Sequence, residues 1–232
     1  MKQLPLGVQL RDHASFATFV AGGNESVVAQ VQALLSESST TVTWLWGPAG
    51  TGKTHLLQAA CAASASVGHR SAYVPLGDAA LSPAVLDGWD ALDLVCGDDL
   101  HRVVGDAAWE RALFALFNGL SEHGSTLLVA SDDSPVTLRF ALPDLESRLR
   151  SGPVFQLTPL DDAGRLQALS EHARARGLEL PSATARYLLG RTRRDMHSLS
   201  AMLETLDRAS LAAQRRLTIP FVRELLAEIG RE

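Results

Sequence analysis

The chain has 232 residues, a formal net charge of −5 and only two cysteines. This charge argues against binding of nucleic acid over the whole surface, and no apolar run approaches the ~20 residues needed to cross a bilayer. No signal peptide is evident. Cys61 and Cys96 lie in apolar segments without the spacing of a zinc site or a disulfide framework. We therefore expect a cytoplasmic protein with buried thiols and no membrane association.

The charge is unevenly distributed along the chain. Residues 1–138 contain 6 Lys and Arg against 14 Asp and Glu, a balance of −8, whereas residues 139–232 contain 15 against 12, a balance of +3. Such an asymmetry fits a basic interface that faces a nucleotide or an acidic partner. A solvated helical face is the commoner explanation.

The first 12 residues combine apolar side chains with Pro5 and Gly7, which prevent regular structure. Such a segment either folds back onto the core or is a peptide that binds a groove of another protein. The residues that would make that contact are Gln3, Leu4, Pro5 and Leu6. An aromatic bend around Phe16 and Phe19 follows, and helical spacing of apolar residues predicts a helix over 24–35.

A phosphate-binding loop is predicted between an apolar strand at 42–46 and an alanine-rich helix at 54–67. The pattern G-x-x-x-x-G-K-[ST] is matched without a gap. Its residues are Gly47, Pro48, Ala49, Gly50, Thr51, Gly52, Lys53 and Thr54. In such loops backbone N–H groups surround phosphate oxygens, the lysine reaches the β- and γ-phosphates, and the hydroxyl ligates Mg²⁺.

The choice of lysine at this position supports the same interpretation. The chain has two lysines, Lys2 and Lys53, and every other side-chain cation is arginine. A compact ammonium and a flat guanidinium are not interchangeable at a phosphate. We therefore expect ADP or ATP with Mg²⁺ as the cofactor.

The remaining strands alternate with helices. Strands are predicted at 71–74, 92–97, 126–130 and 154–157, and helices at Ser82-Pro83 and over 106–122. Short apolar strands alternating with helices indicate an α/β fold with a parallel sheet covered on both faces. After Asp161 the pattern is helical only, with breaks at 177–181, 192–195 and 217–220.

Three acids follow two of the predicted strands. Asp98 and Asp99 end the strand at 92–97, and Asp132 follows the strand at 126–130. Ligands of such sheets bind beyond the carboxyl ends of the strands, so these acids are expected to face the phosphate loop. Asp98 would hold Mg²⁺ through water, Asp99 would orient the attacking water, and Asp132 would sense the γ-phosphate. Taken alone, each is also ordinary turn chemistry.

This series of motifs resembles the DnaA/Hda family of AAA+ ATPases from Phe16 to about Leu226. The shared features are the phosphate loop continuing into His55, the two acidic strand ends, the segment from Leu142 to Leu149, and a helical lid. The resemblance implies a clamp-binding peptide at 1–12, an AAA+ domain at 13–158 and a lid at 159–232. We expect no helix-turn-helix DNA-binding domain after the lid.

The resemblance also implies roles for two arginines. Arg148, in Ser-Arg-Leu, matches the family's arginine finger, and Arg194 matches the lid arginine that contacts the protein's own nucleotide. Phe19, Val20 and Asn24 match more weakly a segment near the adenine. Gly7 departs from the bulky residue of the clamp peptide, and Asp99 is an acid where regulatory members can have an amide.

The expected function is therefore a negative regulator of replication initiation. It would bind the DNA polymerase sliding clamp and use Arg148 to stimulate hydrolysis of the ATP held by the initiator DnaA. A homodimer or a homo-oligomer is compatible with this function. Two alternatives stay open at this point: a remodelling ATPase or helicase loader that hydrolyses its own ATP, and a small-molecule kinase.

Overall fold

A computed structural model of the chain describes residues 14–35, 42–192, 196–213 and 215–229. Five parallel strands form one sheet in the order β2-β3-β4-β1-β5. Parallel strands require crossover connections, which explains the predicted alternation with helices. The strands are β1 (Val42–Trp46), β2 (Ser71–Pro75), β3 (Leu94–Asp98), β4 (Thr126–Ser131) and β5 (Val154–Gln156).

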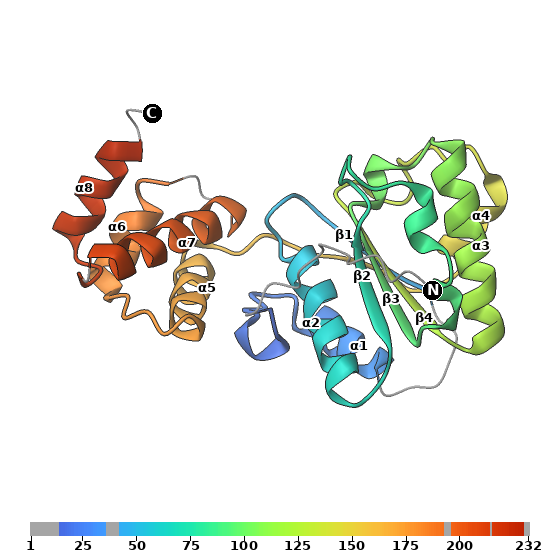
Figure 1. Cartoon of the computed structure of the whole chain (residues 1–232), viewed down its shortest axis with the longest axis horizontal. Helices are drawn as coiled ribbons and strands as arrows, with labels where there is room; N and C mark the ends of the chain where they lie inside the picture. The colour runs from blue at the N-terminus through green and yellow to red at the C-terminus, as the bar shows by residue number, and fades with distance from the viewer. Residues whose placement is uncertain (1–13, 36–41, 193–195, 214, 230–232) are drawn as a thin grey trace.

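Helices cover both faces of the sheet (Figure 1). On one face lie α1 (Glu25–Leu34) and α2 (Lys53–Ser66), and on the other lie α3 (Ala107–His123) and α4 (Pro143–Leu149). Successive strand residues point to opposite faces, so Trp44 packs with α3 and α4 while Leu45 packs with α1 and α2. Burial on both sides explains why the strands contain continuous apolar runs.

A separate bundle follows the sheet (Figure 1). It contains α5 (Asp162–Ala175), α6 (Ser182–Leu189), α7 (Met196–Ala213) and α8 (Ile219–Ile229), which share a core of their own. This bundle is the helical lid, so an α/β sheet lobe followed by a helical lid is confirmed. The domain limits at residues 12 and 158 stay a prediction. Within the described ranges, no helix is both long and apolar enough to cross a membrane.

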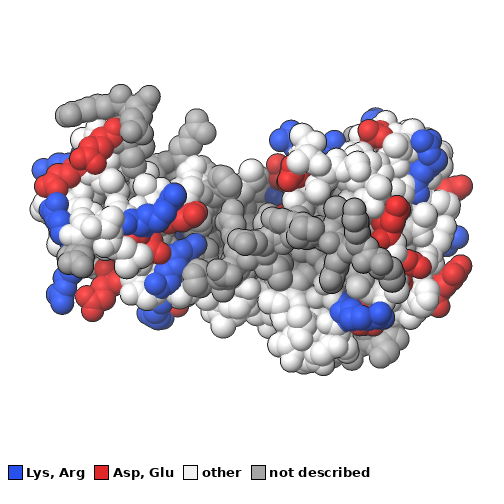
Figure 2. All heavy atoms as spheres, in the orientation of Figure 1, with Lys and Arg blue, Asp and Glu red and all other residues white. Residues whose placement is uncertain are grey.

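Charged side chains of both signs are interspersed on the visible face of the lid (Figure 2). Three lid arginines pair with acids on the lid itself: Arg165 with Asp162, Arg174 with Glu171, and Arg215 with Glu224, at 2.7, 2.8 and 2.8 Å. The excess of Lys and Arg over Asp and Glu in residues 139–232 therefore forms no positively charged patch on the visible face of the lid. It matches the simpler explanation of a solvated helical surface.

The helix predicted to start at Ser82-Pro83 does start there, but it is a single 3₁₀ turn and not an α-helix. Those residues begin a short 3₁₀ turn, η2 (Pro83–Leu86), which is followed by a second turn, η3 (Trp89–Ala91). Asp87 is extended and Gly88 adopts a left-handed φ of 78°, so the chain cannot continue as one helix. Two further 3₁₀ turns are η1 (Phe16–Thr18) and η4 (Leu100–Arg102), and the last lid break begins earlier than predicted, after Ala213.

Glu110 is a fully buried carboxylate on α3 that joins two loops. It accepts hydrogen bonds from the backbone N–H groups of Gly105, Ala141 and Leu142, at 2.7, 3.0 and 2.6 Å. Leu142 is the residue before α4, so these bonds hold the start of that helix. A carboxylate that accepts several N–H groups replaces the water that each group loses on burial.

Replacing Glu110 by Ala is therefore expected to lower the free energy of unfolding by about 2–5 kcal/mol, because buried N–H donors would lose their acceptor. Urea unfolding followed by circular dichroism measures this change. The matched control is Glu122→Ala on the same helix, where the side chain is exposed and a change within about 0.5 kcal/mol is expected. A Glu110→Ala variant as stable as this control would contradict the assignment.

Candidate nucleotide-binding site

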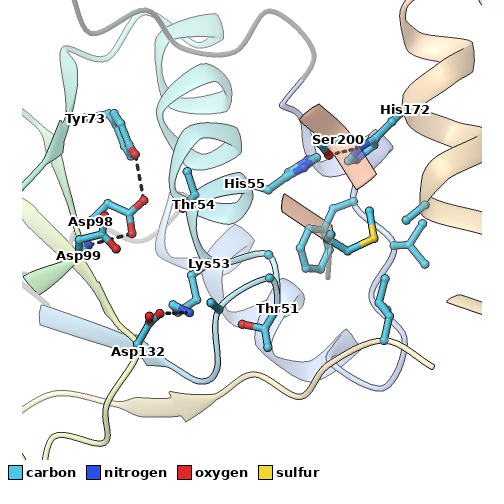
Figure 3. A pocket seen from close by; sticks show the side chains of 18 residues that line it. Thr51, Lys53, Thr54, His55, Tyr73, Asp98, Asp99, Asp132, His172 and Ser200 are labelled. Atoms are coloured by element: carbon cyan, nitrogen blue, oxygen red, sulfur yellow. Dashed lines mark hydrogen bonds and ion pairs between the residues drawn. The ribbon is translucent and has the colours of Figure 1, made fainter. Parts of the chain in front are cut away.

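A pocket of about 390 Å³ opens at the carboxyl ends of the strands, between the sheet lobe and the lid (Figure 3). Its volume is within the range of small-molecule sites. Both lobes contribute to its wall. The lining residues are Phe19, Val20, Ala49, Gly50, Thr51, Gly52, Lys53, Thr54, His55, Tyr73, Asp98, Asp99, Asp132, Leu160, Ala168, His172, Met196 and Ser200.

The loop between β1 and α2 has the backbone that a phosphate cradle requires. Gly52 precedes α2 with a φ of 97°, and a Cβ atom there would lie 2.6 Å from the ring of Phe19. At Gly47 a Cβ atom would lie 2.4 Å from the carbonyl oxygen of Leu157. Both positions therefore exclude a side chain, and the loop turns tightly into the N-terminus of α2.

Lys53 is held by three oxygen atoms. Its Nζ donates to the carbonyl oxygens of Gly47 and Pro48, at 2.6 and 3.0 Å, and forms an ion pair with Asp132 at 2.8 Å. Its side chain is 6% exposed, so the ammonium is almost completely enclosed. The structure thus brings Lys53 and Asp132 together, a contact that the sequence analysis, which assigned Asp132 to sensing the γ-phosphate, did not predict. Gly47 and Pro48 orient Lys53 and do not themselves line the pocket.

Asp98 and Asp99 both line the pocket, but they differ in their surroundings. Asp98 is only 2% exposed; its Oδ2 accepts the Tyr73 hydroxyl at 2.9 Å, and its Oδ1 accepts the Asp99 N–H at 3.0 Å (Figure 3). Asp99 has a left-handed φ of 55° and is half-buried. Burial and then the charge of Asp98 raise the pKa of Asp99 above its usual value.

Tyr73 is a site residue that the sequence analysis missed. Burial, followed by the charge of Asp98, raises the pKa of its phenol well above the usual value. The phenol therefore stays protonated and donates to Asp98. The sequence signal that could have identified Tyr73 was its position in the predicted strand at 71–74. This strand pairs with the strand that ends at Asp98.

His101 is a second residue that the sequence analysis missed. Its Nδ1 accepts the Asp132 backbone N–H at 3.2 Å, and its Nε2 lies 3.8 Å from the Asp132 carboxylate. Acceptance at Nδ1 places the ring proton on Nε2, facing that carboxylate. His101 therefore links the turn after β3 to the end of β4, where Asp132 contacts Lys53.

The opposite wall of the pocket is aromatic. His55 on α2 packs edge-on against Phe19, with ring centroids 5.4 Å apart, and stacks on His172 of the lid at 5.5 Å with an interplanar angle of 20°. His172 in turn contacts Ser200 at 3.4 Å. These contacts connect the phosphate loop to the lid, and their flat faces are suited to a planar ring.

Asn24 closes the base of this wall. It is 2% exposed; its side chain donates to the carbonyl oxygens of Ala21 and Thr158, at 2.8 and 3.0 Å, and accepts the Thr158 N–H at 2.9 Å. These bonds fix the segment after Phe19 to the start of the connection between sheet and lid. Asn24 thus positions the wall and does not line the pocket itself.

The oxygen atoms around the loop suit Mg²⁺. Thr54 and Asp98 line the same pocket and offer a hydroxyl and a carboxylate (Figure 3). Among the described residues, no group of three or more His, Cys, Asp or Glu side chains could hold a metal ion. Mg²⁺ commonly binds one or two protein oxygens and completes its shell with water and phosphate, and the Thr54 hydroxyl and the Asp98 carboxylate are ligands of this kind.

Arg148 lies apart from this pocket. It is exposed on α4, on the sheet face opposite α2, and its guanidinium lies 6.0 Å from the centre of the Phe117 ring. It is not among the residues that line the pocket. Arg194 and the residues Gln3, Leu4, Pro5 and Leu6 lie outside the described residues.

Comparisons with known proteins agree with this geometry. Residues 162–226 match the family model of the Hda lid domain. Domain III of DnaA from Thermotoga maritima is 21% identical, with a TM-score of 0.78, covering 95% of this chain and 98% of that one. The Thermotoga maritima branch-migration motor RuvB, 17% identical with a TM-score of 0.62, shares the fold over 87% of this chain and 68% of its own.

A DnaA structure from Aquifex aeolicus that contains AMPPCP is 26% identical over 85% of this chain, with a TM-score of 0.69. The match spans 66% of the Aquifex chain, so this chain corresponds to about two thirds of that protein. The lid match, the strand order and the phosphate loop agree with one another. The family-model match over the lid and the structural matches to DnaA support an AAA+ protein of the Hda/DnaA type.

Proposed function

We propose that this protein is a nucleotide-bound adaptor that inactivates the replication initiator DnaA. It would dock on the sliding clamp and present Arg148 to ATP held by DnaA. The observation that carries the proposal is the separation of two elements: the phosphate loop faces the lid, whereas Arg148 is exposed on the opposite face of the sheet. An arginine in that place is available to a partner and remote from the protein's own pocket.

The nucleotide of the adaptor would be ADP or ATP with Mg²⁺. The Aquifex relative binds AMPPCP, an adenine nucleotide, and this chain has a phosphate loop and an aromatic wall of its own. Phosphate oxygens would compete with Asp132 and the two loop carbonyls for the three N–H groups of Lys53. Thr54 and Asp98 would hold Mg²⁺, which neutralises phosphate charge when bound. Arg194 would contact the same phosphates.

Arg148 would act on the partner's ATP through charge. Its guanidinium rests against Phe117, which limits its freedom before docking. Both ends of its helix are anchored, because Glu110 holds the start and Arg150 bonds the carbonyl oxygen of Pro135 and the Glu146 carboxylate. A cation held in this way loses little entropy when it reaches the transferring phosphate.

The clamp contact would be made by the N-terminal peptide. Gln3 would form hydrogen bonds beside an apolar pocket filled by Leu4 and Leu6, and Pro5 would reduce the entropy lost on docking. The peptide joins the described chain at Ala14, and the next residue, Ser15, contacts His55 through its carbonyl oxygen at 2.9 Å. A homodimer would engage two grooves of the clamp and gain affinity through avidity.

One observation favours a second candidate function, a remodelling ATPase or helicase loader. Asp99 lines the pocket as an acid, and its raised pKa suits a group that accepts a proton from water. Steady-state ATP turnover by the protein alone separates the two candidates. The adaptor is expected to show weak turnover or none, whereas a remodelling enzyme requires robust turnover.

Lys53→Ala is expected to lower nucleotide affinity at least tenfold, because charged hydrogen bonds worth about 1.5–3 kcal/mol are lost. Titration with a fluorescent ADP or ATP analogue measures the change. Lys53→Arg is also expected to weaken binding, since the enclosed space around Nζ suits a compact ammonium. The control is Lys2→Ala, which changes the other lysine; equal affinity of Lys53→Ala and this control would remove the site assignment.

Arg148→Ala is expected to abolish stimulation of ATP hydrolysis by DnaA, a loss of about 10³–10⁵ if the finger contributes as in other P-loop systems. Nucleotide and clamp affinity should stay within about twofold of wild type, since Arg148 does not line the pocket. Arg70→Ala, at an exposed arginine before β2, serves as the matched control. If Arg148→Ala lost nucleotide affinity as severely as Lys53→Ala, the arginine would act in cis and the adaptor mechanism would be wrong.

A synthetic peptide of residues 1–10 is expected to displace the protein from the clamp, because its two leucines would fill the apolar pocket. Competition measured by fluorescence anisotropy tests this. A peptide in which Leu4 and Leu6 are both replaced by Ala should not compete. Failure of the native peptide to compete would refute the clamp contact and leave the nucleotide site untouched.

A further inference from the structure

A tyrosine on a neighbouring strand contacts the carboxylate that would hold Mg²⁺. In the register of β2 and β3, Pro75 lies opposite Asp98 and Tyr73 lies opposite Cys96. Tyr73 and Asp98 are therefore diagonal neighbours on one face of the sheet, the face that α2 covers. This placement lets the Tyr73 hydroxyl donate to Asp98 Oδ2 at 2.9 Å (Figure 3).

This hydrogen bond and one other fix the orientation of the Asp98 carboxylate. Oδ2 accepts from Tyr73 and Oδ1 accepts from the Asp99 N–H, so each oxygen has a donor. The backbone of Asp99 cannot be changed without moving the strand end. The Tyr73 hydroxyl is therefore the donor to Asp98 that a side-chain substitution can remove. Because Asp98 is only 2% exposed, little water is available to replace that donor.

Tyr73 is itself held by the helix that follows the phosphate loop. Its ring packs against the apolar residues of α2, and Gln58 on the same helix, 4% exposed, lowers the pKa of the phenol against the larger effects of burial and Asp98. The phosphate-loop helix thus packs against the tyrosine that donates to Asp98. The same helix begins with Lys53 and carries Thr54, so one rigid element positions both sides of the metal-binding region.

We infer that Tyr73 is a positioning residue for Mg²⁺: its hydroxyl orients Asp98 toward the water shell of the ion bound with the nucleotide. The inference rests on the proposed nucleotide site, and it concerns the metal and not the partner protein. Residues that orient a metal ligand commonly change metal affinity by 10–100-fold when they are removed. They leave contacts between protein and metal-free nucleotide unaltered.

The test compares Tyr73→Phe with wild type by titrating Mg²⁺ into the intact protein with a fluorescent ADP analogue. Tyr73→Phe is expected to raise the Mg²⁺ concentration at half-maximal binding about 10-fold or more. In EDTA, its nucleotide affinity should stay within about twofold of wild type, which a general loss of structure would not allow. The matched control is Tyr187→Phe, at the other tyrosine of the chain, half-buried in the lid.

The outcomes separate the two claims. An unchanged Mg²⁺ midpoint in Tyr73→Phe, with normal Mg²⁺ dependence in wild type, would overturn the role of Tyr73 and leave the nucleotide site intact. An equal loss of affinity with and without Mg²⁺ would also overturn it, because the tyrosine would then act on structure alone. Nucleotide binding by wild type that does not depend on Mg²⁺ would overturn this inference and leave the nucleotide site intact. Absence of nucleotide binding by wild type, with and without Mg²⁺, would overturn the nucleotide site and this inference together.

Discussion

The enclosed ammonium of Lys53 is the interaction around which the site is arranged. A charge that is 6% exposed requires nearby acceptors, and the loop supplies them through the carbonyl oxygens of Gly47 and Pro48 and through Asp132. These partners come from the loop after β1 and from the end of β4, which are adjacent strands. The ion pair therefore joins the phosphate loop to the neighbouring strand end, and His101 extends this connection to the turn after β3.

The parallel sheet separates two tasks on its two faces. One face carries α1 and α2, and at its edge the aromatic wall meets the lid through His55 and His172. The other face carries α3 and α4, which are joined by the hydrogen bond between Glu110 and the start of α4. Arg148 on α4 is exposed to solvent on this face. Arg150, which follows α4, bonds the carbonyl oxygen of Pro135 and so ties this helix to the segment that follows Asp132. An adaptor that holds one nucleotide and acts on another needs this division.

The sequence predicted the fold because the relevant signals are local. Continuous apolar runs identified the strands, and the glycine pattern located the turn into α2, where Gly52 admits no side chain beside Phe19. The sequence did not predict side-chain contacts that depend on the register between two strands. Tyr73 is 25 residues from Asp98 in the chain, and only the register of β2 and β3 brings them together. The short turns after Ser82 also lacked a local signal, because proline is equally suited to a 3₁₀ turn and to a helix.

The adaptor function is tested most directly by following hydrolysis of the ATP held by DnaA in a mixture with loaded clamp and this protein, from which each component is omitted in turn. We expect hydrolysis above the basal rate of DnaA only when all three are present. Full hydrolysis without DnaA would show that the protein consumes ATP by itself. Full stimulation without the clamp would show that docking is not required. Either result would contradict the adaptor mechanism.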